Sequence, residues 1–166
     1  KRKKTMKRSI KNKLLSLTAA QTLNQIFLHF LILPIIINLL CSYLGSALIS
    51  SDQSTTVVKD FLGAGYPTLV YVMFIILICF AIPFAEEVVF RKWLWFFINK
   101  FLGSTHALII TSILFAFLHG SGSGLALIPF AFYLGYIRKA YGSYKFSTIP
   151  HIVFNLTGVV LTLGGI

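Results

Sequence analysis

The sequence contains few charged residues and very few acidic ones. Charged residues make up 11% of its 166 positions, whereas a soluble domain carries roughly 25%. The acidic side chains are Asp52, Asp60, Glu86 and Glu87. Because 57% of the residues are hydrophobic, most of the surface is expected to face lipid rather than water. This composition excludes a water-soluble globular domain and indicates one integral membrane domain.

Cysteine is equally scarce, with Cys41 and Cys79 each lying in an apolar run. Two isolated thiols form neither a disulfide framework nor a zinc-binding motif. The zinc protease pattern His-Glu-x-x-His is also absent from the sequence. We therefore interpret both cysteines as small buried hydrophobic residues.

The first residues of the chain, in contrast, are densely basic. Eight of the fifteen lysine and arginine side chains lie within residues 1–13. A basic run directly before an apolar segment is typical of an anchor on the anionic lipids of the cytoplasmic leaflet. Nucleic-acid binding is not expected, because the rest of the chain is apolar.

Long hydrophobic runs dominate the remainder of the sequence. We expect five apolar helical segments, near residues 23–49, 66–99, 106–119, 125–137 and 150–166. The first two exceed the ~20 residues that a membrane span needs, and the second is expected to tilt or to kink at Pro83. The third and fourth are short, and the glycine-serine stretch Gly120–Gly124 between them is predicted to be a turn. The predicted fold is an all-α, polytopic bundle of membrane helices.

The chain divides by composition into three parts. Residues 1–22 form a basic cytoplasmic segment, residues 23–65 a first transmembrane helix with an extracytoplasmic loop, and residues 66–166 a core of helices that carries the motifs described below. Beyond residues 1–22, an N-terminus in the cytoplasm places four further basic residues on the inner side, namely Lys100, Arg138, Lys139 and Lys145. The outer side then holds Lys59 alone, so we expect the N-terminus to be cytoplasmic.

The second apolar segment contains a cluster of ionisable residues, Glu86, Glu87 and Arg91. Ionisable groups inside a membrane are costly and point to a functional site. Glu87 and Arg91 are four positions apart, so on a helix they share a face and can pair. Glu86 is turned about 100° away from that face and is free to act. On this motif alone, the interpretation of all three as one buried structural ion cluster stays open.

Two further polar patterns lie in the later apolar segments. His119 ends the third segment, where a lone histidine is more often structural than catalytic. His151 and Asn155 open the fifth segment four positions apart, again on one helix face. Both side chains can donate hydrogen bonds, and neither has a reason to face lipid.

The number of residues along each helix allows the depths of Glu86 and His119 in the membrane to be compared. Counting back from Lys100, Glu86 lies fourteen residues away, which is roughly 21 Å at the helical rise. Counting forward from Thr105, His119 also lies fourteen residues away. The two helices therefore form a hairpin in which Glu86 and His119 lie at a similar level. His151 follows its basic loop closely and is expected to be shallower, unless that loop dips into a cavity.

Three strings now appear in a fixed order: Glu86-Glu87-x-x-x-Arg91, Phe115-x-x-x-His119 and His151-x-x-x-Asn155. They resemble the three motifs of the CPBP (Abi) family of intramembrane glutamic peptidases. This family includes type II CAAX prenyl endopeptidases and bacteriocin-processing or self-immunity proteins. The resemblance covers about residues 80–157. Each motif alone is weak, but three in order within apolar helices make a strong combined signal.

The resemblance implies a peptidase without an obligatory catalytic metal. By this likeness, Glu86 would be the general base that activates water with His119, and His151 and Asn155 would form the oxyanion hole. Glu87 and Arg91 would support that site. Imidazole and amide donors suit a tetrahedral oxyanion in a water-poor site. No cofactor is expected, and zinc held by Glu86, His119 and His151 is the disfavoured alternative.

We therefore expect an intramembrane endopeptidase of a bacterial plasma membrane that cleaves a peptide or protein entering from the cytoplasmic side. Bacteriocin self-immunity or peptide processing is the expected context, by the same resemblance. One alternative is a non-catalytic immunity or scaffold protein that binds a membrane partner and tolerates Glu86→Gln. A small proton-coupled transporter is a third hypothesis, but the first and fourth segments offer few polar residues for a path.

Overall fold

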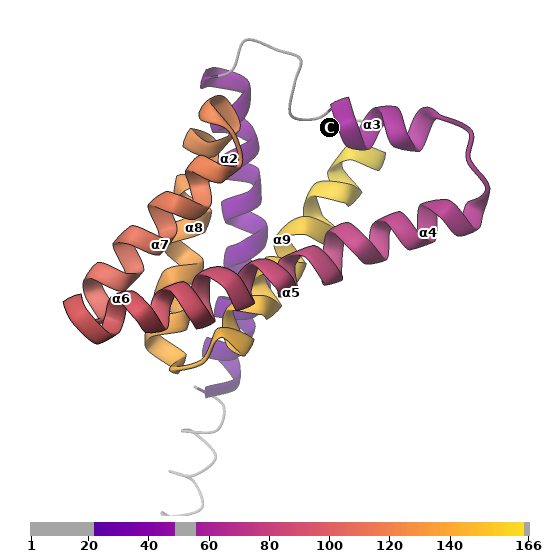
Figure 1. The fold of residues 1–166 in the computed structure, drawn as a ribbon. Helices are drawn as coiled ribbons and strands as arrows, with labels where there is room; N and C mark the ends of the chain where they lie inside the picture. Colours follow the sequence, from indigo (N-terminus) through magenta and orange to yellow (C-terminus); the bar gives the residue numbers. More distant parts are fainter. Residues whose placement is uncertain (1–21, 49–55, 165–166) are drawn as a thin grey trace, which may run out of the picture.

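The computed structural model describes residues 22–48 and 56–164, and every element within them is a helix (Figure 1). In chain order these are η1 (Leu28–Ile32), α2 (Leu33–Leu48), α3 (Thr56–Gly63), α4 (Thr68–Ile76), η2 (Leu77–Ala81), α5 (Ile82–Glu87), η3 (Val88–Leu94), α6 (Trp95–Leu102), α7 (Ser104–Leu118), α8 (Ser121–Tyr141) and α9 (Tyr144–Leu163). The elements labelled η are π-helical turns, which are wider than α-helical ones. The predicted all-α fold is confirmed.

Among the described residues, three helices are long and apolar enough to cross a membrane, namely Thr22–Ala47, Thr68–Leu102 and Tyr144–Leu163. Helix α7 is apolar but shorter. Each of the five predicted apolar segments corresponds to one continuous helical stretch. The protein is therefore an integral membrane helix bundle, as its composition predicts.

The structure corrects three predicted boundaries. Helix α9 begins at Tyr144 rather than at Pro150, because the Ser143 side chain accepts a hydrogen bond from the Lys145 N–H and caps the helix. Helix α8 begins at Ser121, so within the predicted turn Gly120–Gly124 only Gly120, at φ 96°, lies outside the helix. Within the predicted extracytoplasmic loop, residues 56–63 form the short helix α3. Residues 1–21 and 49–55, which include most of the predicted basic segment, lie outside the described residues.

The second span is one uninterrupted helix from α4 to α6, and it continues through Pro83. In η2, just before this proline, the Ile82 N–H bonds to the Leu77 carbonyl, five residues back instead of four. A proline in a helix has no N–H to donate and its ring crowds the preceding turn. The wider π turn accommodates both effects without ending the helix.

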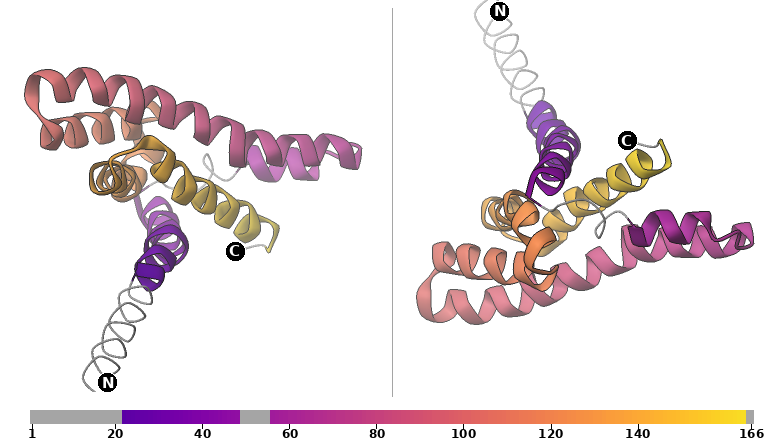
Figure 2. Two further views of the ribbon diagram at one scale, coloured as in Figure 1. Left: turned by 90° about the horizontal axis from the view of Figure 1, so that it is seen from below. Right: turned by 90° about the horizontal axis from the view of Figure 1, so that it is seen from above.

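This long helix crosses α2 at a steep angle (Figure 1). Seen from below and from above, α8 and α9 lie between α2 and the long helix, and α7 runs beside α6 (Figure 2). The core is built around α8, where Phe130, Ala131, Leu134 and Ile137 are almost completely buried. Helices α2, α7 and α9 all pack against α8.

Glycine allows α7 and α8 to approach closely. A Cβ atom at Gly124 would lie 2.3 Å from the Ala116 carbonyl oxygen, and one at Gly135 would lie 2.8 Å from the Ser112 hydroxyl. Any larger side chain at either position would push the helices apart. This close packing holds the end of α7, and therefore His119, against the centre of the bundle.

Candidate active site

The two adjacent glutamates lie in α5, between the π turns η2 and η3, and face different surroundings. The Glu87 side chain is completely buried, whereas 25% of the Glu86 side chain is exposed. π-helical turns within an α-helix often occur at functional sites, because the wider turn changes the direction in which the following side chains point. One carboxylate is therefore enclosed within the bundle, and its neighbour is accessible.

Three polar groups surround the buried Glu87 carboxylate. Arg91 Nε lies 3.9 Å from Glu87 Oε2, the Ser147 hydroxyl donates a hydrogen bond of 2.5 Å to Oε2, and His151 Nδ1 lies 3.2 Å from Oε1. Glu87 and Arg91 are both fully buried, as a pair on one helix face would predict. The sequence therefore correctly predicted that these two residues would meet.

Arg91 also connects the second span to the core. Its Nη2 donates a hydrogen bond of 3.0 Å to the Ala131 carbonyl, and its guanidinium carbon lies 4.6 Å from the centre of the Phe115 ring. Within the described residues, its Nε and Nη1 atoms have no hydrogen-bond partner. The Arg91 charge thus depends on Glu87 and on the aromatic face of Phe115 for its stabilisation.

Glu86 points towards two histidines from different helices. Its Oε1 lies 3.6 Å from His119 Nε2, and its Oε2 lies 3.4 Å from His151 Nε2. His119 Nδ1 lies 2.8 Å from the Phe115 carbonyl oxygen, which can only accept, so the Nδ1 atom carries a proton. The Nε2 atom is therefore the nitrogen that His119 presents to Glu86.

His151 is held between the two carboxylates. Its Nδ1 faces Glu87, its Nε2 faces Glu86, and its ring is 97% buried at the side-chain level. The rings of Phe115 and Phe130 contact it edge-on, with centroid separations of 5.6 Å and 5.2 Å. This packing leaves the imidazole little freedom to rotate, so its orientation towards Glu86 is fixed.

The predicted depths hold for one histidine and fail for the other. Glu86 and His119 do lie at the same level, as their equal distances from the hairpin turn indicate. His151 is not shallower than Glu86, contrary to expectation. Two features explain this: α9 starts six residues before Pro150, and the steep crossing of the long helix brings α5 close to the start of α9 (Figure 1).

Asn155 contacts the backbone of the second span rather than the Glu86 carboxylate. Its side-chain Nδ2 donates a hydrogen bond of 2.8 Å to the Ile78 carbonyl oxygen. In the π register of η2, the donor to Ile78 would be the N–H of Pro83, and proline has none. Asn155 therefore supplies the donor that Pro83 lacks, and it ties α9 to the turn that precedes the glutamates.

This arrangement predicts that the contribution of Asn155 to stability depends on the presence of Pro83. Asn155→Ala should lower the free energy of unfolding by about 0.6–1.7 kcal/mol, the average and the maximum that double-mutant cycles give for hydrogen bonds between membrane helices. Pro83→Ala restores a backbone N–H, so Asn155→Ala should cost much less in that background. Unfolding in detergent of the wild type, both single variants and the double variant measures this coupling. Equal costs of Asn155→Ala in both backgrounds would contradict the assignment.

Sequence analysis missed Ser147 and Phe130 as parts of the site, and it named Phe115 only as the first residue of the Phe115-x-x-x-His119 string. Ser147 lies four residues before His151, on the same face of α9, and both contact Glu87. The four-residue spacing of Ser147 and His151 is visible in the sequence. It places both side chains on one helix face only if α9 begins before Ser147, and the sequence did not predict that. Phe130 carries no such signal, because apolar residues fill most of every helix.

Glu86, His119 and His151 are the residues that could be considered as ligands for a metal ion. Within residues 22–48 and 56–164, no group of three or more His, Cys, Asp and Glu side chains is arranged to hold a metal ion. Glu86 faces both histidines individually, but as placed the three do not form a ligand set.

Comparison with known proteins identifies the family. A family model described as type II CAAX prenyl endopeptidase Rce1-like matches residues 68–157, more than half of the chain. The chain belongs to this family. The match extends from the start of the long helix to Thr157, and it includes all six residues that the motifs predicted. Neither a curated protein nor a solved structure matches the chain.

Membership of the type II CAAX prenyl endopeptidase family establishes the general activity. The protein is a CAAX-type intramembrane protease, which makes it a hydrolase that acts on a peptide or protein substrate. Within the described residues, the three helices that are long and apolar enough to span a membrane agree with a location within the membrane. Helix α2 lies outside the matched range, although it packs directly on α8 and α9.

Proposed function

We propose that this CAAX-type protease hydrolyses its substrate with water that Glu86 and His119 activate. The observation that carries the proposal is the contrast between two neighbouring glutamates. Glu87 is fully buried and its oxygens are occupied, whereas Glu86 is 25% exposed and faces two histidines. A general base must reach both water and substrate, and Glu86 is the carboxylate that satisfies this requirement.

The geometry suits water activation. Glu86 Oε1 and His119 Nε2 are 3.6 Å apart, which is longer than a direct hydrogen bond, and one water molecule can contact both atoms. Glu86 takes a proton from this water molecule while the water oxygen attacks the carbon of the scissile carbonyl. The C–N bond then breaks, and Glu86 returns the proton to the departing amine.

In this proposal, the developing oxyanion is stabilised by His151 and assisted by Asn155. Glu87 holds His151 Nδ1, and this leaves Nε2 on the side of Glu86 where the reaction takes place. An Asn side chain has two N–H donors, and the Ile78 carbonyl accepts a bond from Nδ2, so one donor remains for the oxyanion. Arg91 acts indirectly, by stabilising the Glu87 charge.

The biological setting that we propose follows from the family resemblance and the distribution of charge. The beginning of the first span, near residue 22, the α6–α7 turn and the α8–α9 turn lie on one side of the bundle (Figure 1). Exposed Lys100, Lys139 and Lys145 lie at the two turns, which supports a cytoplasmic orientation for this side. We propose a bacterial plasma-membrane protease for peptide processing or bacteriocin self-immunity, with its basic residues 1–22 on the anionic leaflet.

The role of His119 can be tested against a histidine on the same helix. His119→Ala should reduce kcat by about 100-fold or more, the usual contribution of acid-base groups. His106→Ala removes an exposed imidazole that bonds only to the Leu102 carbonyl within the described residues, and it should leave kcat unchanged. Cleavage of candidate prenylated and membrane peptides in proteoliposomes provides the measurement. Wild-type rates for His119→Ala would exclude it from the reaction.

The proposal includes catalysis without a bound metal. Extensive dialysis of the purified protein against a strong chelator should leave the rate of cleavage unchanged, because the proposed base is a carboxylate rather than a metal-bound hydroxide. The rate should be measured before and after chelation, and again after addition of zinc or magnesium. Loss of activity that zinc alone restores would support the zinc alternative instead.

A further inference from the structure

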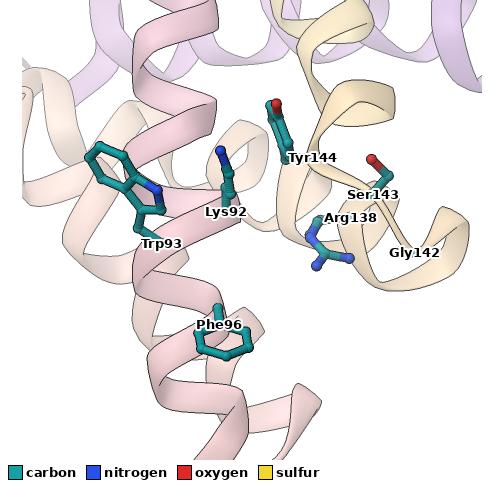
Figure 3. A pocket seen from close by; sticks show the side chains of 7 residues that line it. All are labelled: Lys92, Trp93, Phe96, Arg138, Gly142, Ser143 and Tyr144. Carbon is teal, nitrogen blue, oxygen red and sulfur yellow. The ribbon is translucent and has the colours of Figure 1, made fainter.

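A second polar site lies beyond the glutamates, between the long helix and the α8–α9 turn. A cavity of about 300 Å³ opens here, and Figure 3 shows side chains from both walls. Lys92, Trp93 and Phe96 come from the long helix, whereas Arg138, Ser143 and Tyr144 come from the end of α8 and the start of α9. The proposed mechanism uses none of them.

Two positive charges line this cavity without acidic partners. Within the described residues, neither Lys92 nor Arg138 forms an ion pair with a carboxylate. Arg138 Nε donates to the Arg91 carbonyl at 2.9 Å, and its guanidinium carbon lies 5.2 Å from the centre of the Trp95 ring. These contacts position its charge without neutralising it. In a membrane protein, uncompensated cations beside a cavity favour an anionic ligand.

The backbone adds to this preference. Ser143 and Tyr144 are the cap and the first residue of α9, whose twenty residues give its N-terminus a partial positive charge. The Lys145 and Phe146 N–H groups already bond to Ser143, so this helix end contributes mainly through its dipole. The Lys92 ammonium group also lies near this end, 5.7 Å from the centre of the Tyr144 ring. Three separate sources of positive potential thus converge on one cavity.

The aromatic side chains at its edge indicate the source of the anion. Trp93 is 63% exposed and Phe96 is 69% exposed, on a helix that is long and apolar enough to span the membrane. Exposed tryptophan and phenylalanine at such a position contact acyl chains just below the lipid headgroups. A ligand that combines a phosphate with hydrocarbon matches both parts of the surface.

We propose that this cavity binds the phosphate headgroup of an anionic phospholipid, between Lys92 and Arg138 and at the start of α9, with an acyl chain along Trp93 and Phe96. Arg138, which contacts the bound lipid in this proposal, also donates a hydrogen bond to the Arg91 carbonyl. The lipid site therefore adjoins the backbone of Arg91 but not the glutamates. The bound lipid occupies a site separate from the glutamates, and its binding does not depend on the proposed catalytic mechanism.

Native mass spectrometry of the intact protein, released from bilayers that contain phosphatidylglycerol and phosphatidylcholine, tests this site. Lys92→Gln should weaken retention of phosphatidylglycerol about fivefold, the effect of one lysine near a membrane surface, and Lys92→Glu should weaken it further. Within the described residues the Lys92 ammonium contacts only the rings of Trp93 and Tyr144, so Lys92→Gln should leave folding largely unaffected. Lys100→Gln, which removes a charge on the same side of the bundle, should retain wild-type binding.

Two results would overturn the proposal. Equal phosphatidylglycerol retention by the wild type, Lys92→Gln and Lys92→Glu would show that the cavity does not hold this lipid. Displacement of the lipid by millimolar inorganic phosphate would identify a site for free anions. A further assay measures KM for peptide cleavage with and without phosphatidylglycerol. A KM that rises in Lys92→Gln in both bilayers, with lipid retention unchanged, would assign the cavity to an acidic group of the substrate instead.

Discussion

Glu86→Gln should reduce kcat for peptide cleavage by at least about 100-fold while leaving the amount of folded protein unchanged. Glutamine has nearly the same shape as glutamate but cannot accept a proton from water. The Glu86 side chain is partly exposed and approaches only His119 and His151 within the described residues, so the substitution leaves no buried charge unpaired. Cleavage in proteoliposomes at matched protein levels, together with thermal unfolding in detergent, measures the two effects separately.

Two further measurements make this test decisive. Glu86→Asp keeps the carboxylate but shortens the side chain, so it should retain part of the activity that Glu86→Gln loses. Bacterial cells that express each variant can also be scored for survival of a bacteriocin. Full cleavage and full protection by Glu86→Gln would mean that the protein acts by binding a membrane partner, which is the non-catalytic alternative.

Arg91→Ala should destabilise the fold strongly, by about 3–5 kcal/mol, the cost of breaking a buried ion pair by removing one partner. Glu87 is completely buried, so without the guanidinium its carboxylate would either stay charged without a cationic partner or take up a proton, and both cost stability. The bond to the Ala131 carbonyl and the contact with the Phe115 ring would be lost as well. Folded yield from membranes and the midpoint of thermal unfolding are the quantities to measure.

A compensating double substitution distinguishes charge from packing. Arg91→Met fills much of the same volume, and combining it with Glu87→Gln removes both charges, so the double variant should recover stability relative to Arg91→Met alone. Glu86→Gln serves as the matched control, since it removes a neighbouring carboxylate that is not enclosed. Equal and full folded yields of Arg91→Ala and Glu86→Gln would contradict the division into a structural and a reactive glutamate.

Local sequence patterns were sufficient for much of the candidate site. The spacing of Glu87 and Arg91 placed them on one helix face, and the structure pairs them. Equal distances from one hairpin turn placed Glu86 level with His119, and the structure brings them to 3.6 Å. Both predictions depend only on helical geometry and chain length, so no knowledge of how distant helices pack was needed.

The start of α9 shows where such patterns are insufficient. Proline favours the first turn of a helix, so the sequence predicts that the fifth helix begins at Pro150 and that residues 144–149 belong to a loop. In the structure Ser147 donates to Glu87 and Thr148 donates to the Tyr144 carbonyl, and both are buried inside the bundle. Hydroxyl groups fit an apolar helix only when partners satisfy them, and one of these partners lies sixty residues earlier in the chain.

The sequence by itself determined the membrane environment, the helical fold, the order of the motifs and the pairing of residues within one helix or one hairpin. These properties follow from hydrophobicity and from the fixed rise of a helix. Only the tertiary structure decided that His151 bridges both glutamates and that Asn155 bonds to the Ile78 carbonyl. Both contacts join α9 to the long helix, and the angle at which helices cross arises from side-chain packing over the whole bundle.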